Sequence, residues 1–98
     1  MEVRFCEDVY RLLFDLQLSF RVFFKTDKRD IVLQPCKTYV PVDNDRNGIR
    51  IVFTYYQSSY RGAQNIVVDS QGLGIKPDGE KVDVYIEYDE QDVYKYLI

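Results

Sequence analysis

The sequence contains no histidine, and this absence restricts the chemistry open to the chain more than any other feature. It excludes Ser-His-Asp and Cys-His catalysis, zinc hydrolases with histidine ligands, and the usual general base near neutral pH. Carboxylate pairs, lysine and tyrosine remain as reactive groups, but no stretch of a chain this small indicates the deep pocket that such catalysis needs. We therefore expect a protein that is not an enzyme and that uses no cofactor.

Cysteine is also scarce, with only Cys6 and Cys36 in the chain. Two cysteines without histidine fall short of a structural zinc site, which needs four sulfur or imidazole ligands. The sequence also has no Asp-x-Asp-x-Asp-Gly loop of the calcium-binding kind. We expect no metal site and two buried thiols in a reducing compartment, and the sequence leaves a disulfide open as the alternative.

Long apolar runs are missing as well. The richest apolar stretch, residues 12–24, is interrupted by polar side chains at Asp15, Gln17, Ser19 and Arg21. It is too short and too polar to cross a bilayer. The first eight residues carry acidic side chains where a signal peptide would place lysines. We therefore expect no membrane contact and a cytoplasmic location, which is the host-cell cytosol if the chain is viral.

Length and composition favour a single folded domain over residues 1–98. Hydrophobic residues make up 46% of the chain, which is enough to bury a core at this size. The net charge of −3 is small, whereas disordered chains combine low hydrophobicity with high net charge. No linker or low-complexity tract divides the sequence.

Residues 7–24 fit two patterns, and the fold class depends on which one holds. Four aliphatic side chains have the i, i+3, i+4, i+7 spacing of a helix: Val9, Leu12, Leu13 and Leu16. The even-numbered residues from Tyr10 to Phe24 are apolar, as in a strand, but that strand would far exceed the usual length of about five or six residues. We predict a helix over residues 7–17 and a strand over 18–25, with one long bent strand as the rival.

The rest of the sequence predicts strands separated by polar turns. Further strands are expected over residues 31–40, 49–56, 65–69 and 82–88. Pro35 marks an edge position or a bulge, and the segment 43–48, which ends in Asn-Gly, predicts a loop. Asp89 is placed to cap a short helix over 89–98.

These elements predict an α+β fold, a small antiparallel sheet of about five strands with an N-terminal helix and a short C-terminal helix. An all-β sandwich or barrel is the alternative, and residues 7–24 decide between the two.

Negative charge is concentrated late in the sequence. Residues 77–98 carry seven acidic and two basic side chains, and no lysine or arginine separates Asp83, Glu87, Asp89, Glu90 and Asp92. Strand alternation places Asp83, Tyr85 and Glu87 on one face. The segment predicts an acidic surface that docks on a basic one, and the alternative is a solvated strand that resists aggregation. The same charge disfavours nucleic acid as a direct ligand.

The aromatic residues are divided along the chain. All six phenylalanines lie at or before Phe53, and seven of the nine tyrosines lie from Tyr55 onward. Tyrosine suits surfaces that are dry on one side and wet on the other, so Tyr55, Tyr56, Tyr60 and Arg61 predict a recognition loop. The alternative is an ordinary hairpin loop with one tyrosine on the core. Base stacking is a third interpretation, disfavoured by the few basic residues nearby.

Together these features predict a non-catalytic protein-interaction domain. Its expected partner-binding residues are Tyr55, Tyr56, Tyr60, Arg61, Asp83, Tyr85, Glu87, Asp89, Glu90 and Asp92. In composition the chain is similar to small phage and mobile-element proteins, which implies an inhibitor that covers the basic, nucleic-acid-binding surface of a host protein. The alternative is a structural virion, tail or assembly subunit that self-associates. We expect a monomer or homodimer, or a larger assembly if the role is structural.

Overall fold

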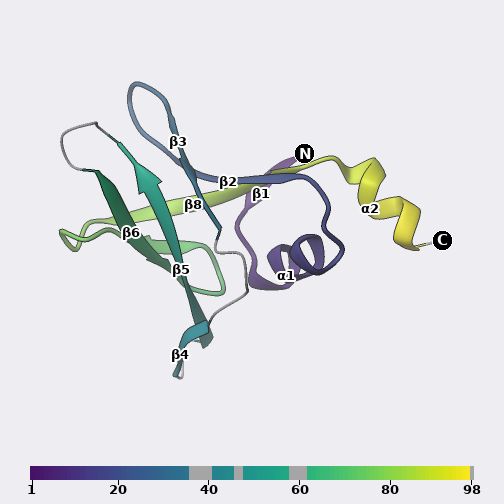
Figure 1. Ribbon diagram of the computed structural model, residues 1–98, viewed down its shortest axis with the longest axis horizontal. Coiled ribbons are helices and arrows are strands. Elements are labelled where there is room, and N and C mark those ends of the chain that lie inside the picture. Colours follow the sequence, from purple (N-terminus) through teal and green to yellow (C-terminus); the bar gives the residue numbers. More distant parts are fainter. Residues whose placement is uncertain (36–40, 46–47, 58–61, 98) are drawn as a thin grey trace.

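The computed structural model describes residues 1–35, 41–45, 48–57 and 62–97. In these residues two helices accompany eight strands, which join in one antiparallel sheet that is nearly barrel-shaped (Figure 1). The strands are β1 (Glu2–Arg4), β2 (Phe20–Lys25), β3 (Asp30–Leu33), β4 (Pro41–Asp45), β5 (Gly48–Tyr56), β6 (Ala63–Val68), β7 (Leu73–Ile75) and β8 (Lys81–Tyr88), and the helices are α1 (Glu7–Asp15) and α2 (Glu90–Leu97).

The sheet runs in the order β3-β2-β8-β7-β6-β5-β4, and β1 pairs with β8 outside this path. The long strand β8 joins the two halves, because its first residues pair with β7 and its last residues pair with β2 and β1. Gln34 and Thr54 then bring the far ends together: the amide of Gln34 donates to the carbonyl of Thr54 at 2.6 Å, and the amide of Thr54 donates back at 3.2 Å. These two bonds nearly close the barrel.

The all-β barrel alternative fits this arrangement better than the α+β fold of about five strands, which is therefore corrected. Three strands, β1, β4 and β7, were not predicted from the sequence. The first and last of these have only three residues each, too few for an alternation pattern. Strand β4 begins at Pro41, which is possible because the first residue of a strand is a position that proline can occupy. Its Asp43-Asn44-Asp45 segment has the composition of a loop.

The split of residues 7–24 into a helix and a strand is confirmed. Helix α1 ends at Asp15 with Leu16 as its C-cap, and the next residue, Gln17, has a φ of 56° in the left-handed region. The amide of Leu18 donates to the carbonyl of Leu13 at 3.0 Å, and the amide of Gln17 donates to the carbonyl of Phe14 at 3.1 Å. This is the hydrogen-bond pattern of a Schellman C-cap. A single long strand is therefore wrong, because the reversal at Gln17 separates the helix from β2.

Other predicted elements are also confirmed in the described residues. The strands predicted over 49–56 and 82–88 correspond to β5 and β8. The hairpin from residue 18 onward corresponds to β2 and β3, and the part of its second strand at 36–40 lies outside the described residues. Asp89 caps α2, because its side chain accepts a hydrogen bond of 2.9 Å from the amide of Gln91.

The core fills the barrel, and α1 covers one end of it (Figure 1). Its buried members come from both halves of the sheet and from the first fifteen residues: Phe5, Tyr10, Leu13, Val22, Phe24, Ile31, Leu33, Ile51, Phe53, Tyr55, Ile66, Val68, Val84 and Ile86. Tyr10 of α1 lies at the centre of an aromatic group, with ring centroids 5.3 Å from Phe53, 5.5 Å from Phe5 and 5.6 Å from Phe20. Cys6, just before α1, is a half-buried free thiol, and Cys36 lies outside the described residues.

Gly72 lies where the chain passes closest to β1 and β8. Its φ is +95°, and a Cβ atom built there would lie 2.8 Å from the carbonyl oxygen of Phe5 and 3.2 Å from that of Val84. The amide of Val84 donates to the carbonyl of Gly72 at 2.8 Å, so this contact is part of the sheet. Only glycine combines this backbone angle with this proximity.

Gly79 supplies a matched control for this position, because its φ is +89° and a Cβ atom there would meet nothing within 4 Å. We expect Gly79→Ala to lower the free energy of unfolding by about 1–2 kcal/mol through the backbone angle alone. Gly72→Ala is expected to lower it by about 1–3 kcal/mol more, because backbone atoms must also move. Urea denaturation measures both variants, and equal losses would contradict the close approach at Gly72.

Candidate interaction surface

The outward side of β1, β2, β3 and β8 carries paired charges of opposite sign. Alternation along each strand directs ten side chains away from the core: Glu2, Arg4, Arg21, Phe23, Lys25, Asp30, Val32, Asp83, Tyr85 and Glu87. We call these ten residues the ion-pair face. Seven of them are charged, and the strand register places the four carboxylates beside the three cations.

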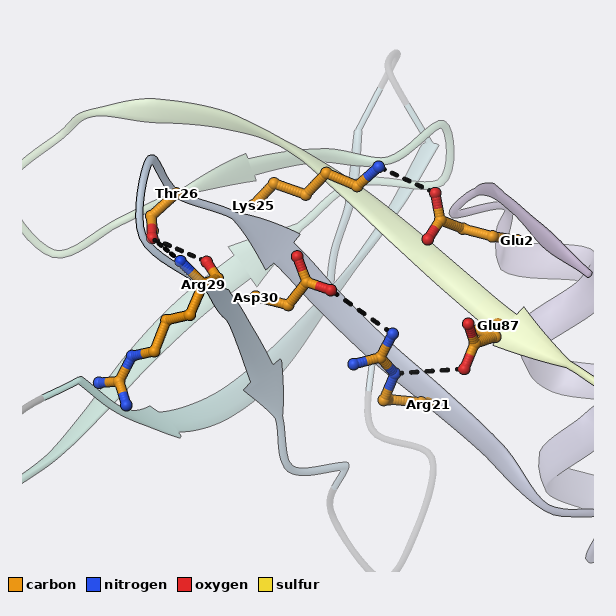
Figure 2. Close-up of polar contacts among 7 residues, drawn as sticks. All are labelled: Glu2, Arg21, Lys25, Thr26, Arg29, Asp30 and Glu87. Carbon is orange, nitrogen blue, oxygen red and sulfur yellow. Dashed lines mark hydrogen bonds and ion pairs between the residues drawn. The ribbon is translucent and has the colours of Figure 1, made fainter.

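The two carboxylates that the sequence placed on an acidic docking surface are paired within the chain. Asp83 lies 3.0 Å from the guanidinium of Arg4, and Glu87 lies 3.4 Å from Nε of Arg21. Arg21 also approaches Asp30, at 3.6 Å, and so bridges β8 and β3 (Figure 2). Each member of these pairs is at least one-third exposed, so each pair contributes modestly to stability. A cationic group that approached Asp83 or Glu87 would have to displace an arginine already in place.

Tyr85 is also held by its neighbours on this face. Its ring stacks on Phe23 with centroids 5.9 Å apart, and the ammonium of Lys25 lies 4.7 Å from its centroid. The guanidinium of Arg21 lies over the ring of Phe23, 4.2 Å from its centroid. Phe23 is therefore fully buried although it points away from the barrel interior. Arginine and lysine thus cover an outer aromatic pair with their charged groups still in solvent.

Lys25 shows the electrostatic effect of this arrangement. Its ammonium donates a hydrogen bond of 2.9 Å to Glu2 (Figure 2), and this bond raises the pKa of Lys25 above its ordinary value, with smaller contributions from the charges of Glu2, Tyr85 and Asp30. A raised lysine pKa stabilises the folded state below the unfolded pKa, and the contribution is lost as the pH rises through the folded pKa. It is therefore fully present at neutral pH.

The adjoining turn between β2 and β3 is also fixed by its own side chains. The hydroxyl of Thr26 donates to the carbonyl of Arg29 at 2.7 Å and accepts from the amide of Arg29 at 3.1 Å (Figure 2). The guanidinium of Arg29 donates to the carbonyl of Gln57 at 2.6 Å, which ties the turn to the end of β5.

The predicted recognition loop is only partly described. Tyr55 belongs to the core: it is fully buried and meets Phe24 edge to face with centroids 5.4 Å apart. Its assignment as a partner contact is therefore corrected, because a partner cannot reach its ring. Tyr56 points the other way along β5 and is 63% exposed, so it remains available. Tyr60 and Arg61 lie outside the described residues.

The acidic residues after β8 have a different setting. Asp89 caps α2, Glu90 begins the helix, and Asp92 lies 3.9 Å from Lys95 in a loose pair one turn along. Helix α2 extends from the end of β8, at the end of the molecule opposite β5 and β6 (Figure 1).

Helix α2 also exposes aromatic surface that the sequence analysis did not select. Tyr94 is 50% exposed and Tyr96 is 58% exposed, whereas Val93 is half-buried against the core. The exposure of these tyrosines could have been predicted from the helix expected at 89–98. If Val93 faces the core, Tyr94 and Tyr96 lie one and three positions further along the helix and therefore on either side of it.

A shallow depression opens at the base of α2. It has a volume of about 510 Å³ and is lined by Met1, Ser19, Phe20, Arg21, Glu87, Tyr88 and Asp89. The hydroxyl of Tyr88 donates to the sulfur of Met1 at 3.4 Å, which places a flexible, half-exposed methionine over the depression. We call the depression together with residues 89–97 the α2 notch. It combines a concave apolar floor with acidic groups and two accessible tyrosines.

The described residues contain no group of three or more Asp, Glu or Cys side chains placed to hold a metal ion. Among those same residues, neither helix has the length and apolar character needed to cross a membrane. Comparison of the chain with protein-family models, with curated proteins and with solved structures gives no match. Its function is therefore inferred from the geometry of its own surfaces.

Arg21 provides a test of the ion-pair face. We expect Arg21→Met to lower the free energy of unfolding by about 1 kcal/mol, because the methionine keeps apolar cover on Phe23 but loses both ion pairs and the cation–π contact. Arg21→Ala should cost about 1–2 kcal/mol more, since it also uncovers the ring.

Lys28→Met is the matched control, because Lys28 is an exposed cation in the β2–β3 turn and its side chain forms no ion pair within the described part of the chain. Urea denaturation should place this control within about 0.5 kcal/mol of the unchanged protein. A loss as large as that of Arg21→Met would show that the ion-pair face has no special role.

Proposed function

We propose that the chain is a non-catalytic protein-interaction domain that docks on a basic surface of a partner protein through the α2 notch. The observation that carries this proposal is the position of α2, which extends from the barrel with Tyr94 and Tyr96 half-exposed beside Glu90 and Asp92 (Figure 1). Val93 packs α2 against the core, whereas the exposed rings of Tyr94 and Tyr96 lie outside that packing, and tyrosine is enriched among the residues that dominate binding energy.

The α2 notch supports this role better than the acidic face first expected on β8. The carboxylates of Asp83 and Glu87 already have arginine partners, so docking there would exchange one ion pair for another. The ion pair that the described part of the chain gives Asp92 is the one with Lys95, at 3.9 Å, and the lysine side chain is 75% exposed. Such a pair opens at small cost, which leaves the carboxylate to attract a cationic partner during encounter.

The finer form of the proposal is an inhibitor of phage or mobile-element type, which covers a nucleic-acid-binding surface of a host protein. Surfaces that bind phosphates are rich in lysine and arginine, and an acidic helix with aromatic side chains is complementary to them. The proposed setting is the cytosol, where the thiol of Cys6 stays reduced. A structural assembly subunit is the second candidate, and a groove on the far side of the barrel favours it.

Neutralising α2 tests the proposal. We expect Glu90→Gln with Asp92→Asn to weaken partner binding about tenfold at low salt and much less at high salt, because exposed charges act mainly through screened attraction. Tyr94→Ala with Tyr96→Ala should weaken it by a further 10- to 100-fold at every salt concentration, since these rings supply buried apolar contact. The partner is first captured from host-cell lysate, then purified and titrated by calorimetry.

Asp15→Asn with Asp27→Asn is the matched control, because it removes the same charge from exposed sites at the end of α1 and in the β2–β3 turn. Binding by this control should equal that of the unchanged protein. If both pairs of substitutions weaken binding equally, only net charge matters and the α2 notch is not the docking site.

A further inference from the structure

A groove on the outward side of β5 to β8 is the second concave surface of the molecule. It has a volume of about 500 Å³ and is lined by Arg50, Val67, Asp69, Gln71, Leu73, Ile75 and Lys81. We call it the outer groove. Its volume falls within the range of about 300–1,000 Å³ typical of binding sites for small ligands and short segments.

A largely aliphatic row crosses neighbouring strands; its members Val67, Ile75 and Lys81 line the outer groove, and Val52 of β5 continues the row beyond it. Strand register pairs Val52 with Val67, Val67 with Ile75, and Ile75 with Lys81. Because strands lie about 4.8 Å apart, these four side chains form a row about 14 Å long that ends in an ammonium group. Ile75 is 37% exposed although it lies at the centre of the row.

The charges at the groove favour an acidic occupant. Lys81 is exposed and forms no ion pair within the described residues, and Arg50 lines the same groove. The single carboxylate there, Asp69, is engaged by the chain: its Oδ1 accepts hydrogen bonds of 2.9 Å from the amides of Gln71 and Leu73. The remaining field is positive at the Lys81 end.

Helix α2 matches the outer groove in length, charge and chemistry. Its eight residues span about 12 Å, close to the length of the aliphatic row. Glu90 and Tyr94 are four residues apart and so share one side of the helix. That side presents the carboxylate of Glu90 and the ring of Tyr94 about one helical turn apart. The carboxylate can then meet Lys81 while the ring covers Ile75, the cross-strand neighbour of Lys81.

The α2 of the same molecule cannot fill this groove. Helix α2 and the strands β5 and β6 lie at opposite ends of the longest dimension, which measures 46 Å (Figure 1). Any α2 in the outer groove must therefore come from another molecule.

We infer that α2 of one copy docks in the outer groove of a second copy, with Glu90 against Lys81 and Tyr94 on Val67 and Ile75. This inference rests on the proposed function, in which α2 is the docking element, and names a second copy of the chain as one of its partners. The contact joins different surfaces on the two molecules, so it repeats from copy to copy and gives open chains or closed rings. Binding of another protein to α2 competes with this assembly.

The expected self-association is weak. We expect an eight-residue helix to bury less than the roughly 1,200 Å² of total surface that stable complexes reach, and we therefore expect weak binding, with a dissociation constant on the order of 100 µM. Sedimentation equilibrium of the full chain should show an average mass that rises with concentration between about 10 µM and 1 mM. A mass that stays at 11.7 kDa throughout would overturn the inference.

Charge exchange tests the contact directly. Lys81→Glu alone and Glu90→Lys alone should each reduce association at least tenfold, because each places like charges at the junction. An equal mixture of the two variants should restore it: the lysine of the altered helix meets the glutamate of the altered groove, and the remaining junctions carry the native Glu90–Lys81 pair. Two variants that stay monomeric when mixed, with circular dichroism of the folded state, would overturn the inference.

Lys28→Glu is the matched control, since it makes the same charge change on the β2–β3 turn, and its association should equal that of the unchanged protein. Partner binding separates this inference from the proposed function. A chain that stays monomeric and still binds its purified partner through Glu90 and Asp92 overturns the inference alone. A chain that assembles, with a partner that is indifferent to α2, overturns only the docking of that partner.

Discussion

The contact of Tyr10 with three phenylalanines is the interaction on which the rest of the structure depends. Phe5 follows β1, Phe20 begins β2 and Phe53 lies in the middle of β5, and the ring of Tyr10 lies within 5.6 Å of all three centroids. Edge-to-face and tilted geometry suits such packing, because the positive ring edge meets a negative ring face. Helix α1 thereby joins both halves of the sheet and supports the closure that the bridge between Gln34 and Thr54 makes in the described residues.

The barrel also determines which charges remain for function. Strand order brings Arg4 and Arg21 next to β8, and their guanidinium groups take up the carboxylates of Asp83 and Glu87. The same cations and Lys25 cover an aromatic pair that would otherwise be an exposed apolar patch. On the ion-pair face every carboxylate thus has a cation of the same chain beside it. Within the described residues, Asp89, Glu90 and Asp92 beyond β8 form no ion pair with these cations, which is why the proposed docking site lies there.

Alternation of apolar and polar residues was sufficient to predict β5 and β8 from the sequence, because each strand is long enough to show two distinct faces. It placed Tyr55 on the same side as Ile51 and Phe53, and the core position of Tyr55 agrees with that alternation rather than with the composition of the following loop. The pairing of Glu87 with Arg21 was beyond the sequence, since it depends on β2 lying beside β8. The outer groove also could not be predicted from the sequence. It depends on β7, a strand of three residues that pairs with β6 on one side and with β8 on the other.

The α2 notch and the outer groove are separate concave surfaces of one small barrel, lined by different residues. If α2 packed in the outer groove of its own molecule, it could not bind another molecule. Because α2 is held away from that groove, it can contact either a second copy or a basic partner. Both proposed contacts use the side of α2 that carries Glu90 and Tyr94, so they would exclude each other. At low concentration the helix is open to the partner, and at high concentration a growing fraction is occupied by other copies, because weak association follows mass action. A partner that binds α2 tightly would therefore draw molecules out of the assembly without any change in the fold of the barrel.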